Sequence, residues 1–372
     1  LKMKYYIIAG EASGDLHGAN LIKALKKEDP NGEFRAWGGD LMHGAGAKLV
    51  KHYKDLAFMG FLEVVMNLRT IFKNISFCKK DIEAFQPDVL IFIDYPGFNM
   101  RIAKWAKANN FKTHYYISPQ IWAWKENRIH QIKRDVDKMY VILPFEKDFY
   151  ELKHNMPVTF VGHPLIDAIA NRPKLDVKTV YTKYGLSNQP IIVLLPGSRK
   201  QEIKKMLRVM LSVIDDFPEY QFVIAGAPSQ SEEFYQTFIK NSKIKFVSNA
   251  TYDLLSVADA ALVTSGTATL ETALFKVPQV VCYKSSWLSY KIGKQVVKLD
   301  YISLVNLIMD REVVCELIQN DLNTKRLTKE LNHILDPKTQ QNVKDEYDAL
   351  EKKLGGPGAS QKVAKAVFQD LK

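Results

Sequence analysis

The feature that most constrains the fold is a hydroxyl-rich turn at residues 264–271, which read Thr-Ser-Gly-Thr-Ala-Thr-Leu-Glu. A short apolar run, 260–263, comes before the turn, and a helical pattern and a second β-rich run, 279–283, come after it. Because short apolar runs bounded by turn residues are typical of buried strands, this order predicts strand, turn, helix and strand, which is one βαβ unit.

The predicted turn suits an anionic ligand. Ser265, Gly266 and Thr267 would lie on the first backbone N–H groups of the helix, which have no partner inside the helix and lie at the positive end of its dipole. Gly266 leaves room for a ligand beside the backbone, and Ala268 continues into the helix. We therefore expect a phosphate or diphosphate here, with Glu271 accepting hydrogen bonds from a ribose. The alternative is an ordinary helix start that is capped by its own side chains.

Composition narrows the class of protein. The 372 residues suggest roughly two domains, and 47% apolar with 25% charged residues is normal for a soluble globular protein. Three widely spaced cysteines argue against a disulfide framework and a cysteine zinc site, and they fit a reducing compartment. We expect no signal peptide and no membrane-spanning helix, since no apolar run approaches about 18 residues. The net charge of +11 indicates acidic partners, which include nucleic acid, anionic lipid and phosphorylated substrates.

Two predicted strand ends in the first half of the chain carry candidate functional residues. The run 5–9 predicts a buried strand followed by Gly10-Glu-Ala-Ser-Gly-Asp15, which implies an open parallel α/β sheet. The run 88–94 predicts another strand that ends in Asp94. Because the carboxyl ends of such strands face the ligand crevice, Asp94 is a candidate general base. The alternative is that Asp94 caps the following helix.

Residues 56–77 combine a wide apolar helical face with nearby cations. Such a helix can lie on an anionic membrane or hold acyl chains, and it can equally pack on its own sheet. The residues that would contact a lipid are Phe58, Met59, Phe61, Leu62, Val65 and Met66.

A tryptophan-containing stretch, 118–124, leads into a run of basic residues. Trp122 and Trp124 would line a sugar or lipid site or belong to the core. The basic run would be a solvated helix face or a phosphate contact, and its members are Lys125, Arg128, Lys133 and Arg134.

Asp135-Val-Asp137 matches the D-x-D pattern with which some glycosyltransferases hold a metal. It precedes a predicted strand, 138–143, and so lies at the sheet edge away from ligands. We therefore prefer a role at the strand entry.

The second half of the chain predicts a further α/β domain. A polar stretch, 171–189, has the character of a linker, and the strand 190–195 with its turn, Pro196-Gly-Ser-Arg199, opens the domain. Ser198 and Arg199 are well placed for a diphosphate at the start of the next helix, unless Arg199 is simply exposed. Residues 312–319 and 361–371 predict helices.

Seven blocks of the chain resemble, in order, the lipid-A-disaccharide synthase family, and the likeness extends from Tyr5 to about Gln319. The blocks are Gly10-Glu-Ala-Ser-Gly-Asp15, Ile93-Asp-Tyr-Pro-Gly-Phe-Asn99, Tyr116-Ile-Ser-Pro-Gln-Ile-Trp-Ala-Trp124, Leu143-Pro-Phe-Glu146, Leu195-Pro-Gly-Ser-Arg199, Ser265-Gly-Thr-Ala268 and Tyr301-Ile-Ser-Leu-Val-Asn-Leu307. The family's aspartate block more often reads Asp-Ala-Pro-Asp-Phe-Asn. Here Tyr95 and Gly97 replace the alanine and the second aspartate, which puts a role for that second carboxylate in doubt but leaves Asp94.

The resemblance implies an α/β fold of the GT-B type, in which two Rossmann-like domains face one cleft. It implies an acceptor- and membrane-facing domain over 1–170, a linker over 171–189, a UDP-sugar-binding domain over 190–340 and a helical tail over 341–372. The tail would return to the first domain or exchange between the chains of a homodimer.

The implied reaction is an inverting transfer from UDP-2,3-diacylglucosamine to 2,3-diacylglucosamine 1-phosphate, which yields lipid A disaccharide 1-phosphate and UDP with no metal or other cofactor. By block matching, Asp94, Arg199 and Asn306 are the functional aspartate, arginine and asparagine, and Glu11 is a rival base. Arg199 and Asn306 would also contact the donor, beside the 265–268 turn and Glu271.

The acylated substrates also favour docking of residues 56–77 on an anionic membrane surface. The resemblance therefore predicts a cytoplasmic enzyme that is peripheral on the inner face of the bacterial inner membrane.

Three other classes fit less well. A UDP-N-acetylglucosamine 2-epimerase or another GT-B enzyme shares the outline, but an epimerase has no use for the apolar segment 56–77. A nucleic-acid-binding protein would gather its cations into one tract, and no such motif is present, so we expect no nucleic acid partner. A nicotinamide oxidoreductase would need the G-x-G-x-x-G fingerprint, which the first turn lacks.

Overall fold

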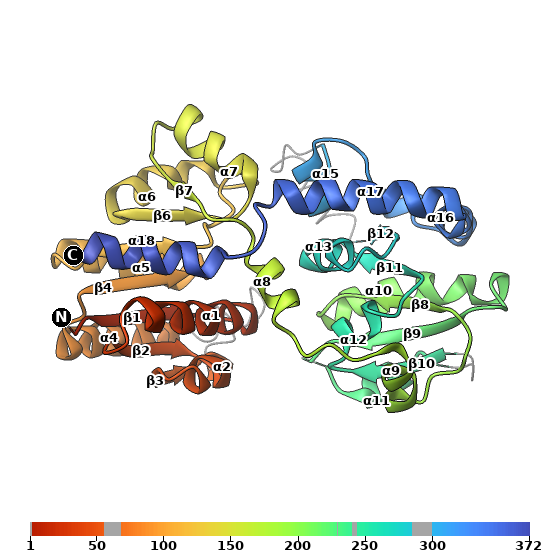
Figure 1. Cartoon of the computed structure of the whole chain (residues 1–372), viewed down its shortest axis with the longest axis horizontal. Helices are drawn as coiled ribbons and strands as arrows, with labels where there is room; N and C mark the ends of the chain where they lie inside the picture. Colours follow the sequence, from red (N-terminus) through yellow and green to blue (C-terminus); the bar gives the residue numbers. More distant parts are fainter. Residues whose placement is uncertain (1, 56–67, 229, 240–243, 285–299) are drawn as a thin grey trace. The chain divides into compact units, whose positions relative to one another are not determined.

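The chain forms two compact units, each built on one parallel sheet (Figure 1). Unit 1 comprises Leu1–Ala170 and Leu354–Lys372, and unit 2 comprises Asn171–Lys353. The computed structural model describes residues 2–55, 68–228, 230–239, 244–284 and 300–372.

The sheet of unit 1 has the strand order β3-β2-β1-β4-β5-β6-β7, and every neighbouring pair is parallel. Tyr5 on β1 lies opposite Phe34 on β2 and Val89 on β4, so the order reverses between β1 and β4. The strands are β1 (Lys4–Ala9), β2 (Glu33–Gly38), β3 (Lys48–His52), β4 (Val89–Ile93), β5 (Thr113–Tyr116), β6 (Lys138–Val141) and β7 (Thr159–Phe160).

Helices cover both faces of this sheet, because its central strands are apolar on both sides. One face carries α1 (Ala12–Glu28), α8 (Pro164–Ala170) and α18 (Ala359–Leu371), which pack on one another. The other carries α4 (Leu68–Phe85), α5 (Pro96–Ala108) and α6 (Ile129–Asp135), which bury an aromatic core with Trp37 and Phe92. The shorter elements are α2 (Asp40–Gly44), η1 (Tyr53–Asp55), η2 (Glu126–Arg128), α7 (Pro144–Asp148) and η3 (Phe149–Lys153).

The sheet of unit 2 repeats the plan with the order β10-β9-β8-β11-β12-β13, and its order reverses between β8 and β11. The strands are β8 (Ile191–Leu195), β9 (Gln221–Gly226), β10 (Ile244–Ser248), β11 (Ala260–Thr264), β12 (Gln279–Tyr283) and β13 (Cys315–Ile318).

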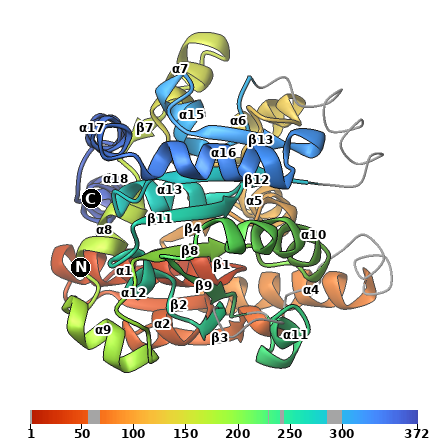
Figure 2. The same cartoon turned by 90° about the vertical axis from the view of Figure 1, so that its right-hand side faces the viewer.

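Two apolar clusters hold helices on the two faces of the second sheet (Figure 2). One includes α10 (Lys200–Met210), η4 (Leu211–Asp216) and α16 (Thr324–Leu335), and the other includes α9 (Val177–Tyr184), α12 (Thr251–Leu255) and α13 (Thr267–Leu274). The remaining elements are α11 (Glu232–Gln236), α15 (Leu304–Met309), η5 (Gln319–Asp321) and α17 (Pro337–Lys353).

The predicted α/β class is confirmed, and one local prediction is wrong. Residues 312–319 do not form a helix, because Cys315–Ile318 is strand β13 and pairs with β12. Leu317 is fully buried there, so strand pairing and core packing override the local helical pattern.

The polar stretch 171–189 contains a helix. Asp176 caps α9 by accepting a 3.0 Å hydrogen bond from the Thr179 N–H, and Gly185 ends the helix with φ of 60°. Both residues lie within unit 2.

In the C-terminal tail, helix α17 belongs to unit 2 and helix α18 belongs to unit 1.

The proposed lipid-contacting residues Phe58, Met59, Phe61, Leu62, Val65 and Met66 lie outside the described residues. The described helix α4 follows them and leaves Phe72 and Phe77 exposed. Of the helices that the structure describes, none has the length and apolar character to cross a membrane.

Candidate active site

The first group of candidate residues lies where the strand order of unit 1 reverses. In open parallel sheets, ligands bind beyond the carboxyl ends of the strands at this point. Gly10 follows β1 and Asp94 follows β4, so both lie there. A Cβ atom on Gly10 would lie 2.3 Å from the Tyr95 ring, so only glycine fits. The Asn99 amide donates to the carbonyl oxygens of Asp94 at 2.7 Å and Ile8 at 3.4 Å, which ties the two strand ends together.

The backbone at these strand ends is strained. Asp94 (φ 43°) and Tyr95 (φ 49°) at the end of β4, and Ile117 (φ 63°) at the end of β5, adopt left-handed conformations that cost non-glycine residues on the order of 1–3 kcal/mol each. The Tyr115 hydroxyl donates to the Asp94 carbonyl at 2.6 Å, and the Asp94 N–H donates to the Tyr116 carbonyl at 3.2 Å. These bonds hold the strained turn, and strain of this kind is typical of functional sites.

The pKa of the Asp94 carboxyl group is raised toward neutral pH. Its pKa is raised from 3.8 to about 6, first by burial and second by the negative charge of Glu11, against a lowering hydrogen bond from the Tyr95 N–H. Glu11 is exposed at the N-cap of α1, directly after β1. A carboxylate with this pKa can accept a proton from a substrate hydroxyl.

A buried glutamate anchors the loop that follows β5. Glu146, at the start of α7, accepts hydrogen bonds from the N–H groups of Ile142 (3.1 Å) and Leu143 (2.9 Å) and from the Trp122 indole (3.2 Å). Burial raises the pKa of Glu146 to about 7, while these donors lower it. The Ser118 hydroxyl, also on the loop, bonds the Tyr150 hydroxyl at 2.6 Å.

The second group of candidate residues lies where the strand order of unit 2 reverses, at the ends of β8 and β11. Gly197, after β8, has φ of 101°, and Arg199 is exposed at the N-cap of α10. Gly266, after β11, has φ of 151°, and a Cβ atom there would meet open space. Thr267 begins α13, so its N–H is one of the unpaired N-terminal donors.

Two hydroxyls of this turn donate hydrogen bonds to main-chain carbonyl groups. Ser265 donates to the Ile302 carbonyl at 2.8 Å, and Thr269 donates to the Gly266 carbonyl at 2.8 Å. Their protons are therefore committed to the main chain. An anion at this turn would therefore not receive hydrogen bonds from these two hydroxyls, whereas the buried Thr264 hydroxyl has no partner among the described residues.

Asn306 is fully buried, and its amide is bonded on both sides. Its Nδ2 donates to the Val314 carbonyl and to Glu316 Oε1, both at 2.9 Å, and its Oδ1 accepts from the N–H groups of Val313 and Val314. Glu316 in turn accepts from the N–H groups of residues 302 and 303, at 3.0 and 2.9 Å. Asn306 therefore orients the segment that accepts the Ser265 hydrogen bond.

Glu271 accepts a 2.7 Å hydrogen bond from the Tyr252 hydroxyl. Burial raises the pKa of Glu271, and the Tyr252 hydrogen bond opposes this effect. Ser198, in the turn after β8, donates its N–H to Glu202 at 3.2 Å.

The D-x-D residues lie at the amino-terminal ends of the unit 1 strands, directly before β6, and so opposite the carboxyl ends that carry Asp94. Asp137 accepts from the Thr113 N–H at 3.0 Å and pairs with Lys107, and Asp135 pairs with Arg134 at 2.6 Å. The predicted strand-entry role is therefore confirmed.

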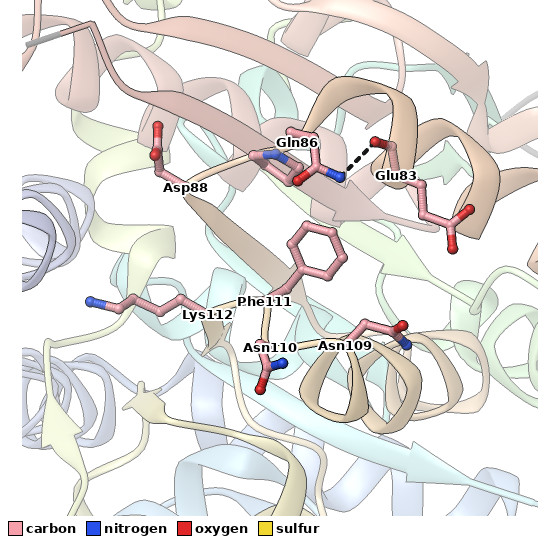
Figure 3. Close-up of a pocket in the computed structure, with 8 residues that line it drawn as sticks. Glu83, Gln86, Asp88, Asn109, Asn110, Phe111 and Lys112 are labelled. Atoms are coloured by element: carbon pink, nitrogen blue, oxygen red, sulfur yellow. Dashed lines mark hydrogen bonds between the residues drawn. The ribbon is translucent and has the colours of Figure 1, made fainter.

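A polar cavity of about 490 Å³ lies at this same amino-terminal edge (Figure 3). Within it, the Gln86 side chain donates to the Glu83 carbonyl at 2.8 Å. The cavity contains none of the candidate residues, and its edge is the one away from ligands. Its lining comes from the segments before β4 and β5: Glu83, Gln86, Pro87, Asp88, Asn109, Asn110, Phe111 and Lys112.

Sequence similarity decides the family. A sequence model of the lipid-A-disaccharide synthetase family matches residues 5–368. The chain belongs to this family. The lipid-A-disaccharide synthase of Syntrophus aciditrophicus (strain SB) is 40% identical over 367 residues, which cover 96% of this chain and 95% of the relative. That of Geobacter metallireducens is 39% identical over 373 residues, which cover 98% and 96%. The predicted glycosyltransferase of this family is confirmed.

Solved structures agree on the fold. The UDP-GlcNAc 2-epimerase from Neisseria meningitidis, bound to UDP-GlcNAc, superposes with a TM-score of 0.72 at 14% identity, and the match covers 99% of this chain and 100% of that one. A glycosyltransferase from Rickettsia africae gives a TM-score of 0.61 at 12% identity, with 100% and 98% covered. At such identities the likeness concerns the fold alone, and the predicted GT-B fold is confirmed.

Proposed function

We propose that this chain condenses UDP-2,3-diacylglucosamine with 2,3-diacylglucosamine 1-phosphate to form lipid A disaccharide 1-phosphate and UDP. Membership of the synthetase family supports the reaction. The structural observation that carries the proposal is Asp94, which has a strained backbone at the strand-order reversal of unit 1 and a carboxyl group whose pKa is raised to about 6.

Asp94 is the proposed general base. It takes the proton from the 6-hydroxyl of the acceptor while that oxygen attacks the anomeric carbon of the donor. The bond from the anomeric carbon to the UDP oxygen breaks with its electron pair, so UDP leaves and the sugar centre inverts. Glu11 is the rival base, because it also lies at this reversal point and its charge acts on Asp94.

The residues of unit 2 are proposed to hold the departing UDP. The N–H groups at the start of α13, beside Gly266 and Ala268, and the Arg199 guanidinium would bind the diphosphate. Fixed positive groups lower the barrier because they stabilise the negative charge that grows on the leaving group. Glu271 would accept from the ribose hydroxyls.

Asn306 is proposed to act through its neighbours. Its amide holds Glu316, and Glu316 holds the backbone of residues 302 and 303 that supports the Ser265 turn. Loss of the amide would therefore loosen the donor site.

We also propose that the enzyme attaches peripherally to the inner face of the inner membrane through residues 56–67 and the exposed Phe72 and Phe77. Exposed charge attraction is screened by salt, so vesicle binding should weaken as ionic strength rises. Vesicle binding that neither salt nor a Phe58/Phe61 double polar substitution reduces would contradict this attachment. A homodimer that exchanges α18 is a further proposal, which sedimentation at several protein concentrations tests.

The reaction is tested by thin-layer chromatography with the purified chain and both substrates, with and without a chelator. Disaccharide in both reactions would establish transfer without a metal. Disaccharide only without chelator would point to a metal, and no product despite bound UDP would favour a different UDP-sugar enzyme.

A further inference from the structure

The loop after β5 ends in an exposed aromatic ring with two cations against it. The Lys125 ammonium lies 4.1 Å from the centre of the Trp124 ring, and the Arg128 guanidinium carbon lies 6.0 Å from it. Trp124 is 46% exposed, so the ring and its cations face solvent. Cations at these distances are attracted to the ring face, which holds them in place.

Neither cation is neutralised by a carboxylate within the described part of the chain. The one acidic residue between them, Glu126, is paired instead with Lys153 at 2.7 Å and His154 at 2.9 Å. The two positive charges are therefore available to an external anion.

The loop that presents these residues is firmly anchored. Trp122 is bonded to the buried Glu146, and Ser118 to the buried Tyr150. Lys125 itself has φ of 132°, a conformation that L-residues rarely adopt. The loop is thus fixed before Trp124, and the cations follow directly after the fixed part.

This cation pair and Asp94 both lie beyond the carboxyl ends of the strands of the unit 1 sheet. The loop leaves β5, the neighbour of β4, and the Tyr115 hydroxyl bonds the Asp94 carbonyl at 2.6 Å. Burial and the Asp94 charge raise the pKa of Tyr115, and the positive charge of Arg128 opposes this rise. Arg128 is therefore within electrostatic reach of the residue that holds Asp94.

We propose that Lys125 and Arg128, held on the Trp124 ring, bind the phosphate monoester of the acceptor sugar. The proposal rests on the reaction proposed above and adds the site that recognises the acceptor. A phosphate monoester carries close to two negative charges at neutral pH, and arginine matches its geometry with two parallel hydrogen bonds. In the acceptor, the phosphate is on C1 and the 6-hydroxyl is carried by C5, and these two carbons flank the ring oxygen, so the two groups lie a short distance apart. Binding the phosphate beside β5 would therefore direct the 6-hydroxyl toward β4 and Asp94.

The kinetic test compares two acceptors, 2,3-diacylglucosamine 1-phosphate and 2,3-diacylglucosamine without the phosphate. The Lys125→Gln/Arg128→Gln variant should lose roughly tenfold to a hundredfold in kcat/KM with the phosphorylated acceptor, mostly through KM. With the phosphate-free acceptor it should match the wild type. Lys133→Gln is the control, because it removes an exposed positive charge from the neighbouring helix α6 without a ring beneath it. Equal losses with both acceptors, or no loss with either, would overturn the proposal.

A binding test separates this site from the reaction. Tryptophan emission is titrated with glucosamine 1-phosphate in the wild type, in Arg128→Gln and in Trp124→Phe, which keeps a ring but removes the reporter. We expect a saturable change in the wild type that is lost in Trp124→Phe and weakened in Arg128→Gln. If no disaccharide forms but this change persists, the reaction is wrong and the phosphate site remains. If disaccharide forms but emission is unaffected in all three, the phosphate site is wrong.

A third arm excludes membrane phosphates as the ligand. Vesicles of anionic phospholipid should bind the double variant as well as they bind Lys133→Gln. A loss of vesicle binding with unchanged acceptor discrimination would reassign the cations to the lipid surface and overturn the proposal.

Discussion

The assignment of Asp94 as the general base predicts how kcat/KM depends on pH. Burial, and after it the charge of Glu11, raise the pKa of Asp94 from 3.8 to about 6, which corresponds to about 3 kcal/mol in favour of the protonated form. Only the ionised carboxylate can accept the proton from the acceptor. We therefore expect kcat/KM to rise about tenfold per pH unit below pH 6 and to level off above it.

The variant Glu11→Gln removes one of the two causes of this raised pKa and keeps the shape of the side chain. The lower limb of the profile should then move to more acidic pH, because less negative charge opposes ionisation of Asp94. It should stay above 3.8, since burial, the larger cause, remains. The plateau above pH 7 should change little if Asp94 is the base.

The assay measures UDP release between pH 4.5 and 8.5 for the wild type, Glu11→Gln and Asp94→Asn. Asp94→Asn should lose roughly 10²–10⁴ in turnover while it retains UDP affinity. If Glu11→Gln instead loses that much and Asp94→Asn stays active, the roles are reversed and Glu11 is the base. A profile that is flat through pH 6 would refute a titrating carboxylate at this position.

Three further predictions address the donor site and stability. Arg199→Ala should weaken UDP binding, measured by calorimetry, by roughly tenfold or more because a charged contact to the diphosphate is lost; unchanged affinity would remove Arg199 from the site. Asn306→Ala leaves several buried groups unpaired, so the melting temperature should fall and kcat should drop, and a variant that melts and turns over like the wild type would contradict the orienting role. Burial lowers the pKa of His17 to about 4, below its unfolded value near 6.5, so its contribution to stability is present above pH 6.5 and is lost as the pH falls toward 4. Urea unfolding at pH 7 and pH 5 should therefore show a smaller loss on acidification for His17→Gln than for the wild type, and equal losses would refute this.

The strand ends that carry the site were predictable because central parallel strands are nearly continuous apolar runs that stop at Gly, Asp or Pro. The run that ends before Asp94 is fully buried along β4, and the run before Ser265 is buried along β11. Strand β2, which pairs with both β1 and β3, escaped prediction because Glu33 and Arg35 interrupt its apolar pattern.

Contacts between distant segments were not predictable. Asn99 follows β4, yet its amide reaches the end of β1, and this link exists only because those strands are neighbours. The role of Asn306 depends on Glu316, which lies on a strand whose local sequence favours a helix. The local sequence pattern indicates which polar residues follow the end of a strand. The pairing between strands, which the local pattern does not reveal, decides which of these residues come into contact.

The two strand-order reversals have opposite electrostatic character, and this contrast itself argues for a division of labour. The reversal in unit 1 presents the carboxylates of Glu11 and Asp94, and burial makes one of them basic enough to accept a proton near pH 6. The reversal in unit 2 presents the Arg199 cation and the N–H groups at the start of α13, which attract negative charge. A transfer from a nucleotide sugar needs both functions, because a proton must leave the acceptor while charge accumulates on the diphosphate. A charge reversal such as Arg199→Glu should therefore weaken UDP binding more than Arg199→Ala does, whereas Arg199→Lys should retain part of it. Equal UDP affinities for the alanine and glutamate variants would mean that electrostatic attraction is not how this position acts.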